Sequence, residues 1–297
     1  MSALGRATMK ETMTIAVAKA KRIAFQGEPG AYANLAAREA VPHAQAIAHA
    51  SFEDAIEAVR SGDCDLCIIP VENSLIGRIA DIHHLLPDSG LHIVGEHFLP
   101  IRHQLLGLPT ATLDDITDVY SQAPALAQCR TILRERKLQA HNWYDTAGSA
   151  KHVADMAHPK AAAIASTLAG ELYGLKVLAA DVEDEHHNAT RFLIMSRAAE
   201  LAPNAGKVVT TFVFRVKNVP AALYKAIGCF ATANINITKL ESYQLGGSFN
   251  ATQFYADIQG HTADAAVAHA LDELRFYTTK LDILGVYPAH PYREDMP

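Results

Sequence analysis

The sequence is poor in several features, and each shortage narrows the range of functions. Only four of the 297 residues are cysteine, which favours a reducing compartment over a disulfide-linked secreted scaffold. No apolar run approaches the roughly 18 residues that a membrane span needs. The net charge is −6, and a chain with this acidic excess is poorly suited to nucleic acid, which is bound through Lys and Arg. We therefore expect a cytoplasmic protein that binds neither membranes nor nucleic acid.

Patterns typical of metal and nucleotide sites are missing as well. Cys64 and Cys67 are three positions apart, but no second such pair follows, and a zinc site needs about four ligands. The segment around these two cysteines indicates a buried strand. The sequence GEPG at 27–30 lacks the ending of a phosphate-binding Walker loop. We therefore expect no metal and no cofactor.

What the chain does contain is a regular alternation of strand and helix patterns from residue 22 to residue 199. Strands separated by helices of about 10–15 residues indicate a mostly parallel α/β sheet, in one piece or in two. The apolar stretch at 91–108 is too long for one strand, and Pro100 interrupts it. We expect this stretch to pass from one lobe of the protein to another.

The pattern changes after residue 199. A small and polar stretch at 200–207 predicts a linker, and the order of elements over 208–290, β-α-β-β-α-β, is that of ferredoxin-like domains. Residues 1–21 are expected to form a disordered extension, and residues 291–297 a tail. The sequence thus predicts two domains with different architectures.

Polar side chains follow several of the predicted strands, which is where ligands bind in sheets of this kind. Glu72 and its two neighbours follow one strand, Ser121 follows another, and Thr146 a third. Taken singly, such residues often cap a helix or fold a turn, and Gln128, one helical turn beyond Pro124, could face solvent. Because all of them fall at one predicted edge, a shared binding site explains them better than separate roles.

A second group, Thr190, Arg191 and Phe192, stands at the start of an apolar strand and after the acidic run DVEDE. Read singly, Arg191 could pair with that run and Phe192 could belong to the core. Five segments of the chain together resemble the prephenate dehydratases: FQGEPGAY, IPVENSLIGR, SQAPALAQC, DTAGSA and EDEHHNATRF. The second domain resembles the ACT amino-acid-binding domains that are fused to those enzymes. The resemblance covers roughly residues 22–290, and its most specific motifs are ENS followed by Gly, and N-x-TRF.

The resemblance implies both a fold and a reaction. Residues 22–199 would form an α/β catalytic domain of two lobes, similar to type II periplasmic-binding proteins, and residues 208–290 a ferredoxin-like ACT regulatory domain. The enzyme would be a hydro-lyase, a carbon–oxygen lyase of phenylalanine biosynthesis. It would convert prephenate to phenylpyruvate with loss of water and carbon dioxide. Because the ring becomes aromatic, this chemistry needs no metal, redox cofactor or covalent nucleophile.

The resemblance also implies roles for individual residues. Thr190 would hydrogen-bond to the departing ring hydroxyl, Arg191 would pair with a substrate carboxylate, and Phe192 would pack near the ring or shape the pocket. Glu72 would act as an acid if burial raises its pKa, or it would orient Asn73. Neutral hydrogen bonds to the substrate would come from Asn73, Ser74, Ser121, Gln128 and Thr146.

In many relatives, phenylalanine binds to the ACT domain at a GAL-type loop and an ESRP-type strand, at a dimer interface. The corresponding residues here are Asn218, Pro220, Ala221, Ala222, Leu223, Glu241 and Ser242. Ala221 replaces a glycine of the family, and Tyr243–Gln244 replace Arg-Pro. We expect feedback binding of phenylalanine and a homodimer or homotetramer, with a purely structural dimerisation domain as the alternative.

Two departures from the family lie in the catalytic domain, where Gln122 replaces a frequent histidine and Ala33 a frequent serine. Two other functions remain open. Arogenate dehydratase differs only in an amine on the substrate in place of the keto group. A non-catalytic amino-acid sensor would also fit two lobes joined to an ACT domain, but a sensor has no need of Thr190 at the position of the leaving group.

Overall fold

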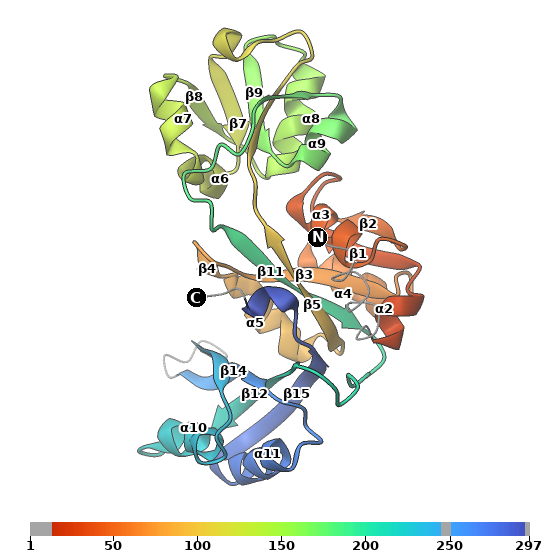
Figure 1. Ribbon diagram of the computed structural model, residues 1–297, viewed down its shortest axis with the longest axis vertical. Coiled ribbons are helices and arrows are strands. Elements are labelled where there is room, and N and C mark those ends of the chain that lie inside the picture. Colours follow the sequence, from red (N-terminus) through yellow and green to blue (C-terminus); the bar gives the residue numbers. More distant parts are fainter. Residues whose placement is uncertain (1–13, 245–250, 295–297) are drawn as a thin grey trace.

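The computed structural model describes residues 14–244 and 251–294. Its elements form three blocks along the long axis of the molecule (Figure 1). A middle lobe contains the N-terminal strands and β11 (Ala189–Ser196). An upper lobe is formed by the segment between β5 (His92–Pro100) and β11, and a lower C-terminal domain follows. Two sheets run through these blocks, one shared by the middle lobe and the C-terminal domain and one in the upper lobe.

The middle lobe is a mixed sheet in the order β5-β11-β3-β1-β2. β1 runs parallel to β2 and β3, whereas β11 runs antiparallel to β3 and β5. The Ser51 side chain caps α4, because it accepts a hydrogen bond from the backbone N–H of Asp54. The elements are α2 (Ile15–Lys19), β1 (Arg22–Gln26), α3 (Tyr32–Ala40), β2 (Gln45–His49), α4 (Phe52–Ser61), β3 (Leu66–Asn73), β4 (Gly77–Arg78), α5 (Ala80–Leu85), η1 (Leu86–Asp88), β5 (His92–Pro100) and β11 (Ala189–Ser196).

The upper lobe has its own five-stranded sheet in the order β10-β6-β9-β7-β8. The chain enters it between β5 and β6 and leaves it between β10 and β11, so the prediction that residues 91–108 pass between two lobes is confirmed. The elements are β6 (Gln104–Gly107), η2 (Leu113–Asp115), β7 (Asp118–Ser121), α6 (Ala123–Gln128), α7 (Arg130–Glu135), β8 (Gln139–Asn142), α8 (Thr146–Met156), β9 (Ala161–Ala165), α9 (Thr167–Tyr173) and β10 (Lys176–Ala179).

The C-terminal domain has the predicted β-α-β-β-α-β order, with its strands arranged β13-β14-β12-β15. Its two helices pack on one face of this sheet over the aromatic side chains of Phe212, Phe214 and Phe254. This is the ferredoxin-like fold. The elements are β12 (Val208–Val216), α10 (Ala222–Thr232), β13 (Ile237–Gln244), β14 (Ala251–Gln259), α11 (Ala265–Tyr277), β15 (Thr278–Pro288) and η3 (Pro291–Glu294).

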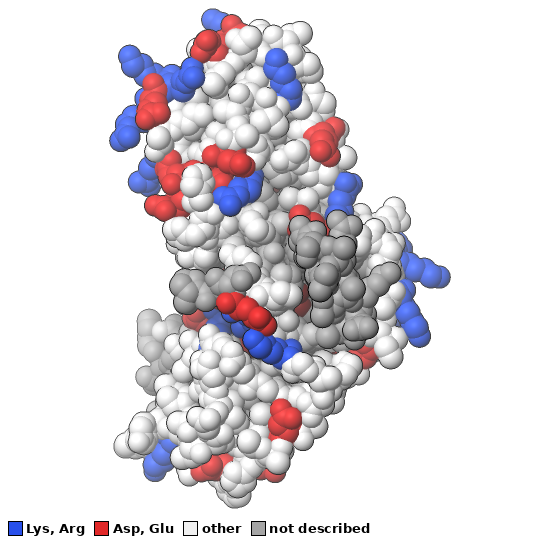
Figure 2. Space-filling model, in the orientation of Figure 1, with Lys and Arg blue, Asp and Glu red and all other residues white. Residues whose placement is uncertain are grey.

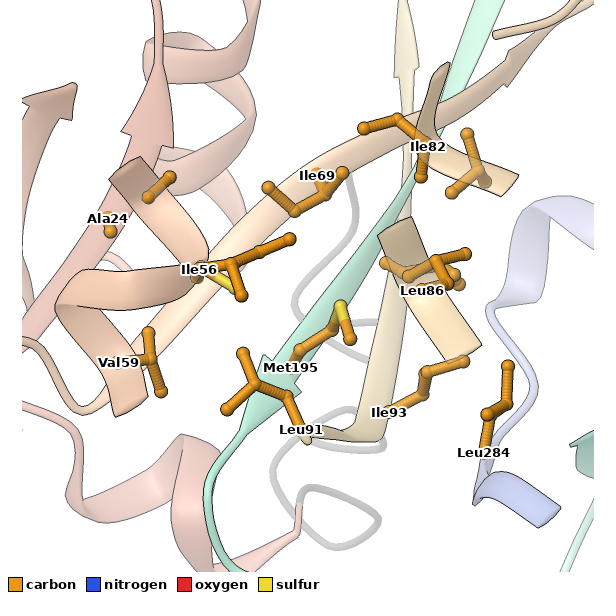
Figure 3. Packing of buried hydrophobic residues seen from close by; sticks show 14 of the residues in the cluster. Ala24, Ile56, Val59, Ile69, Ile82, Leu86, Leu91, Ile93, Met195 and Leu284 are labelled. Atoms are coloured by element: carbon orange, nitrogen blue, oxygen red, sulfur yellow. The ribbon is translucent and has the colours of Figure 1, made fainter. Parts of the chain in front are cut away.

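The C-terminal domain and the middle lobe are fused through a common core. One buried cluster contains Ile69, Ile93 and Met195 of the middle lobe together with Leu284 and Tyr287 of the C-terminal domain, and Figure 3 shows several of these side chains packed against one another. β15 also pairs with β5. A side chain at Gly285 would place its Cβ 2.2 Å from the backbone oxygen of Ile93, so only glycine permits this approach.

The structure corrects three expectations. Residues 15–19, expected to be disordered, form helix α2, and the Thr14 hydroxyl donates to the Val94 backbone oxygen at 3.2 Å. Residues 1–13 of the predicted extension lie outside the described residues. The sheets are mixed rather than mostly parallel, because the chain returns through β11 as an antiparallel neighbour of β3 and β5. Strand β2 has no counterpart in the predicted elements.

The remaining expectations concern cysteines and membranes. Cys64 and Cys67 are buried and unpaired, as their strand-like segment predicts. Within residues 14–244 and 251–294, no helix has the length and apolar character that crossing a bilayer requires.

Candidate active site

A cleft with a cavity volume of about 240 Å3 lies between the middle and upper lobes. The start of α3 and the adjoining ends of β3 and β11 line it from the middle lobe, and α6 and the first turn of α8 line it from the upper lobe. The structure brings five of the predicted residues together around this cleft. They are Asn73, Gln128, Thr146, Thr190 and Phe192.

The orientation of the Asn73 amide is fixed by the backbone. Its side-chain oxygen accepts hydrogen bonds from the N–H groups of Leu75 and Ile76, at 3.0 and 3.1 Å. The amide nitrogen therefore donates, and it does so to the Thr190 hydroxyl oxygen at 3.0 Å. Because that oxygen accepts from Asn73, the proton of Thr190 is left for another partner. No acceptor for this proton is found among the described residues, so it can be donated into the cleft.

The same direction of donation continues into the upper lobe. Asn73 also donates to the Asn188 side-chain oxygen at 2.7 Å, so the Asn188 nitrogen donates to the Gln128 oxygen at 3.1 Å. The Gln128 oxygen lies 2.9 Å from His103 Nε2, which must carry the hydrogen. In a neutral His103 with its hydrogen on Nε2, Nδ1 is an acceptor. The Tyr32 hydroxyl lies 2.7 Å from Nδ1 and 3.0 Å from the backbone oxygen of Arg102. The Gln128 nitrogen has no partner within the described part of the chain and is available to a ligand in the cleft.

The surroundings of His103 favour its neutral form. Burial lowers the pKa of His103 below its ordinary value and raises the pKa of Tyr32, since removal from water disfavours the charged form of either group. Sequence reasoning missed His103 and Tyr32. Their positions in the sequence could have marked them as candidates for the site. His103 lies within the stretch expected to cross between the lobes, and Tyr32 lies within the FQGEPGAY segment.

The acidic run before the TRF motif makes hydrogen bonds where the chain passes between the two lobes. The buried Glu183 carboxylate accepts from the Arg102 side chain and from the His103 backbone N–H, both at 2.8 Å. The Asp184 carboxylate accepts from the first two backbone N–H groups of α7, both at 3.0 Å. The run therefore holds local structure, and Arg191 does not pair with it.

Two predicted substrate ligands do not reach the cleft. The Ser121 side chain is fully buried and donates to the backbone oxygen of Ile164 at 2.7 Å. The Ser74 hydroxyl donates to the backbone oxygen of His187 and accepts from the N–H of Ala189, both at 2.9 Å. Both hydroxyls join backbone segments, so the prediction that they bind substrate is corrected.

Arg191 also points away from the cleft. Successive side chains on a strand face opposite sides, and here Thr190 and Phe192 face the cleft while Arg191 faces the C-terminal domain. Its side chain is 2% exposed. The predicted bond to a substrate carboxylate does not fit this geometry, because the guanidinium is already bound. Its partners are Glu96 (2.8 Å), Glu72 (2.9 Å), Asp257 (2.6 Å) and Tyr287 (2.9 Å).

Glu72 faces the same way as Arg191 and does not have the properties expected of an acid. Burial alone would raise its pKa, but the charges of Arg191 and Lys239 outweigh burial and lower the pKa. Its carboxylate is hydrogen-bonded to these two cations and not to Asn73. Both predicted roles, a proton donor with a raised pKa and a group that orients Asn73, are therefore wrong for this arrangement.

The predicted effector residues fall in two segments of the C-terminal domain. One is the loop before α10 (Asn218, Pro220 and Ala221) with the first residues of that helix, Ala222 and Leu223. Ala221 has φ +62°, a left-handed conformation that favours the glycine it replaces. The other segment is the edge strand β13, on which the Ser242 backbone oxygen accepts from Arg78 of β4 at 3.0 Å.

Asp145 is the only Lys, Arg, Asp or Glu among the described residues that line the cleft. Burial raises its pKa. No cluster of His, Cys, Asp and Glu suited to a metal ion occurs in the described ranges.

Comparisons with known proteins identify a family. A family model described as prephenate dehydratase matches residues 23–200. A protein of Komagataeibacter europaeus, named a bifunctional N-acyl-homoserine lactone acylase/prephenate dehydratase, is 49% identical over 91% of this chain and 97% of its own length. An Arabidopsis thaliana protein named arogenate dehydratase/prephenate dehydratase 2 is 38% identical over 90% of this chain and 72% of its own.

Two solved structures are similar over most of their length. One, described as GqqA, a novel type of quorum quenching acylases, has a TM-score of 0.87 and 48% identity over 92% of this chain and 100% of its own. The other is a prephenate dehydratase from Arthrobacter aurescens in complex with L-Phe. It has a TM-score of 0.83 and 29% identity over 93% of this chain and 91% of its own.

Proposed function

The chain belongs to the prephenate dehydratase family, and on that basis we propose that the cleft between its lobes converts prephenate to phenylpyruvate. Membership makes the chain an enzyme, a hydro-lyase of phenylalanine biosynthesis, rather than a non-catalytic sensor. The ring hydroxyl leaves, the ring carboxylate departs as carbon dioxide, and its bonding electrons make the ring aromatic. One proton from solvent completes the water that is released.

The observation that carries this mechanism is the direction of the hydrogen bond at Thr190. Asn73 donates to the threonine oxygen, so the threonine proton is free for an acceptor in the cleft. A threonine hydroxyl is too weak an acid to transfer its proton outright. It stabilises the negative charge that develops on the leaving oxygen by donating a hydrogen bond from a fixed position. Phe192 packs beside the ring from the same strand.

The two substrate carboxylates need donors, and the cleft supplies neutral ones. Helix α3 starts at Tyr32 without a side-chain cap, so the N–H groups of its first turn are available at the cleft, and such N–H groups bind anions well. The Gln128 nitrogen and the Thr146 hydroxyl provide further donors on the facing lobe. We assign one carboxylate to α3 and the other to the upper lobe.

Arogenate is a second candidate substrate, and one observation favours it. The side chain of Asp145 lines the cleft, where its carboxylate can pair with the ammonium group that arogenate carries in place of the keto group. Relatives named for both substrates match nearly the whole chain. Asp145 also caps α8, so substitution of this residue tests both roles together.

Hydrolysis of N-acyl-homoserine lactones is a second candidate activity. It rests on the 49% identity to a relative named as a bifunctional acylase and on the matching structure. Release of homoserine lactone from an acylated substrate by the purified chain would support it. Prephenate added as a competitor would show whether both reactions use the same cleft.

We further propose that residues 208–290 form an ACT regulatory domain, joined through the linker 200–207 to the catalytic domain 22–199. Phenylalanine would bind at the two segments named above, within a homodimer or homotetramer in the cytoplasm. The related structure in complex with L-Phe supports this effector. Binding would be measured by calorimetry on the full chain.

The test is phenylpyruvate formation by the purified chain from prephenate and from arogenate, each with and without phenylalanine. Thr190→Val should lower kcat about 10²–10³-fold, the loss expected for one donor to a developing charge, while KM changes little. Thr190→Ser should retain part of the rate. Thr167→Val, at an exposed position on α9, is the matched control. Near-normal turnover by Thr190→Val would refute the assigned role.

A further inference from the structure

The Arg191 guanidinium joins the middle lobe to the C-terminal domain. It donates to Glu72 of β3 and Glu96 of β5 on one side, and to Asp257 of β14 and Tyr287 of β15 on the other. The side chains of Glu96 and Asp257 are fully buried. Burial alone would raise the pKa of Asp257, but the charge of Arg191 lowers it. Both partners of this pair are therefore ionised, and neither can move away alone without leaving a buried charge unpaired.

The surrounding charges are balanced. Arg293 binds both oxygens of Glu96, at 2.6 and 2.8 Å, and Lys239 is hydrogen-bonded to Glu72. Three cations and three carboxylates form the core of the cluster, with Arg191 at the centre and Asp257 completing the set. Lys239 also contacts a fourth carboxylate, that of Glu241, which pairs with Arg78. Half of the six groups belong to the middle lobe and half to the C-terminal domain and the segment after it. Figure 2 shows acidic and basic side chains together at the surface of the same junction.

This cluster and the proposed active site lie on opposite faces of the strand pair β3 and β11. In the pairing of β3 with β11, Thr190 lies opposite Asn73, and the next pair is Arg191 opposite Glu72. The first pair faces the cleft and the second faces the C-terminal domain. The register shifts immediately after Arg191, and such a bulge re-aims the side chains around it. A displacement of the Arg191–Glu72 pair must therefore move the backbone that carries Asn73 and Thr190.

We propose that Arg191 is a positioning residue for the reaction: it fixes the backbone of β11 against Asp257 of the C-terminal domain and so holds the Thr190 hydroxyl in its donating position. This inference rests on the proposed dehydratase function. The C-terminal domain then completes the active site without touching the substrate. Its strand β13, which carries the predicted effector residues Glu241 and Ser242, reaches the same cluster through Lys239.

The test weakens the link from the C-terminal side, without changing any group in the cleft. Asp257→Asn keeps the shape of the side chain and removes its charge, and Tyr287→Phe removes one hydroxyl that contacts Arg191. We expect kcat to fall about 10-fold in Asp257→Asn and about 3-fold in Tyr287→Phe, with KM nearly unchanged in both. Effects of this size are within the range of coupling energies that packed networks transmit. Asp282→Asn, which removes a surface charge from the same domain, should match the parent chain.

Rates are compared per folded molecule, with the folded fraction taken from thermal unfolding. Arg191→Lys adds a second readout, because lysine keeps the charge but lacks the planar fork that binds several partners at once. It should keep KM and lower kcat. If Asp257→Asn does not fold, the kcat of Tyr287→Phe alone tests the positioning role of Arg191.

The possible outcomes are distinct. An unchanged kcat in the folded Asp257 and Tyr287 variants, with an active parent chain, overturns the positioning role alone. A rise in KM at constant kcat also overturns it, because it would indicate a role in substrate binding. A parent chain that turns over neither prephenate nor arogenate overturns the proposed function, and the positioning role with it.

Discussion

The middle lobe has two junctions, and they are built from different interactions. Toward the upper lobe it offers a cleft bridged by uncharged hydrogen bonds among Asn73, Asn188, Gln128 and His103. Toward the C-terminal domain it offers a shared apolar core, a strand pairing and a buried cluster of charges. Uncharged hydrogen bonds contribute only about 0.5–1.5 kcal/mol each, and the same kind of bond joins Ser166 and Tyr173 of the upper lobe to the backbone oxygens of Gly30 and Pro29. Separation of the first junction therefore leaves no buried charge unpaired among these bonds. The second cannot open without exposing core.

One strand serves both junctions. Thr190 and Phe192 belong to the cleft, and Arg191 between them belongs to the charged cluster. The TRF motif therefore does not act as one binding unit. It divides between the chemistry on one side of β11 and the attachment of the C-terminal domain on the other.

The largest expected effect comes from breaking the charged junction. Arg191→Leu leaves the buried carboxylates of Glu96 and Asp257 without their central cation and should cost about 3–5 kcal/mol of unfolding free energy. Thr190→Val, one residue away, should cost about 1 kcal/mol. Urea unfolding of both variants measures the difference. Equal losses would show that the two junctions do not differ as described.

A substitution in the cleft should have the opposite balance, with a large effect on catalysis and a small effect on stability. Gln128→Ala removes the amide that faces the ligand and should lower kcat/KM about 10–100-fold, as expected for one or two lost hydrogen bonds to a charged group. The unfolding free energy should change by less than in Arg191→Leu, because the hydrogen bonds that are lost are uncharged. Steady-state kinetics and urea unfolding on the same preparations check both. A large loss of stability with normal kinetics would contradict the prediction.

Two groups, His103 at the cleft and Asp257 at the charged junction, should lose their contributions to stability in different pH ranges. The folded pKa of His103 is lowered by burial, so its contribution to stability is fully present above its ordinary pKa of about 6.5 and is lost as the pH falls through the lowered value. The folded pKa of Asp257 is lowered by Arg191 despite burial, so its contribution is lost only in stronger acid, below about 3.9. On acidification, His103 should therefore lose its contribution before Asp257 does.

His103→Gln tests this order. Glutamine can donate to Gln128 and accept from Tyr32 as neutral histidine does, but it does not titrate. We expect near-parental kcat/KM at pH 8 and a weaker decline toward pH 5. A pH profile identical to that of the parent chain would show that another group causes the decline.

The smallest effect lies outside both junctions. Ala221 is held at φ +62°, which costs an alanine about 1–2 kcal/mol, and glycine loses roughly 0.5–1 kcal/mol more backbone entropy on folding. Ala221→Gly should therefore stabilise the chain by roughly 0.5 kcal/mol, measured by thermal unfolding. Because Ala221 contributes to neither junction, dehydratase kinetics without effector should be unchanged. A loss of stability would show that the alanine methyl group makes contacts that outweigh the strain.

The sequence predicted most elements because their signals are local. The alternation of strand and helix patterns and the interruption at Pro100 each act over a few residues. The placement of Thr190, Asn73 and Gln128 at one cleft followed from the motifs. Arg191 was misplaced although the period of a strand already puts adjacent residues on opposite faces. Its partners Glu96 and Asp257 lie 95 and 66 residues away in the chain, and no local pattern indicates such pairings.

The path of the chain through the upper lobe determines when the strands of the middle sheet can pair during synthesis. β11 lies between β5 and β3 in the middle sheet, yet it is made only after the whole upper lobe, which occupies the chain between β6 and β10. During synthesis the growing chain therefore carries two unpaired strand edges, which are sites of wrong association. The strand that closes this gap is the one that bears Thr190, so the last strand of the middle lobe to be made also supplies the proposed catalytic group.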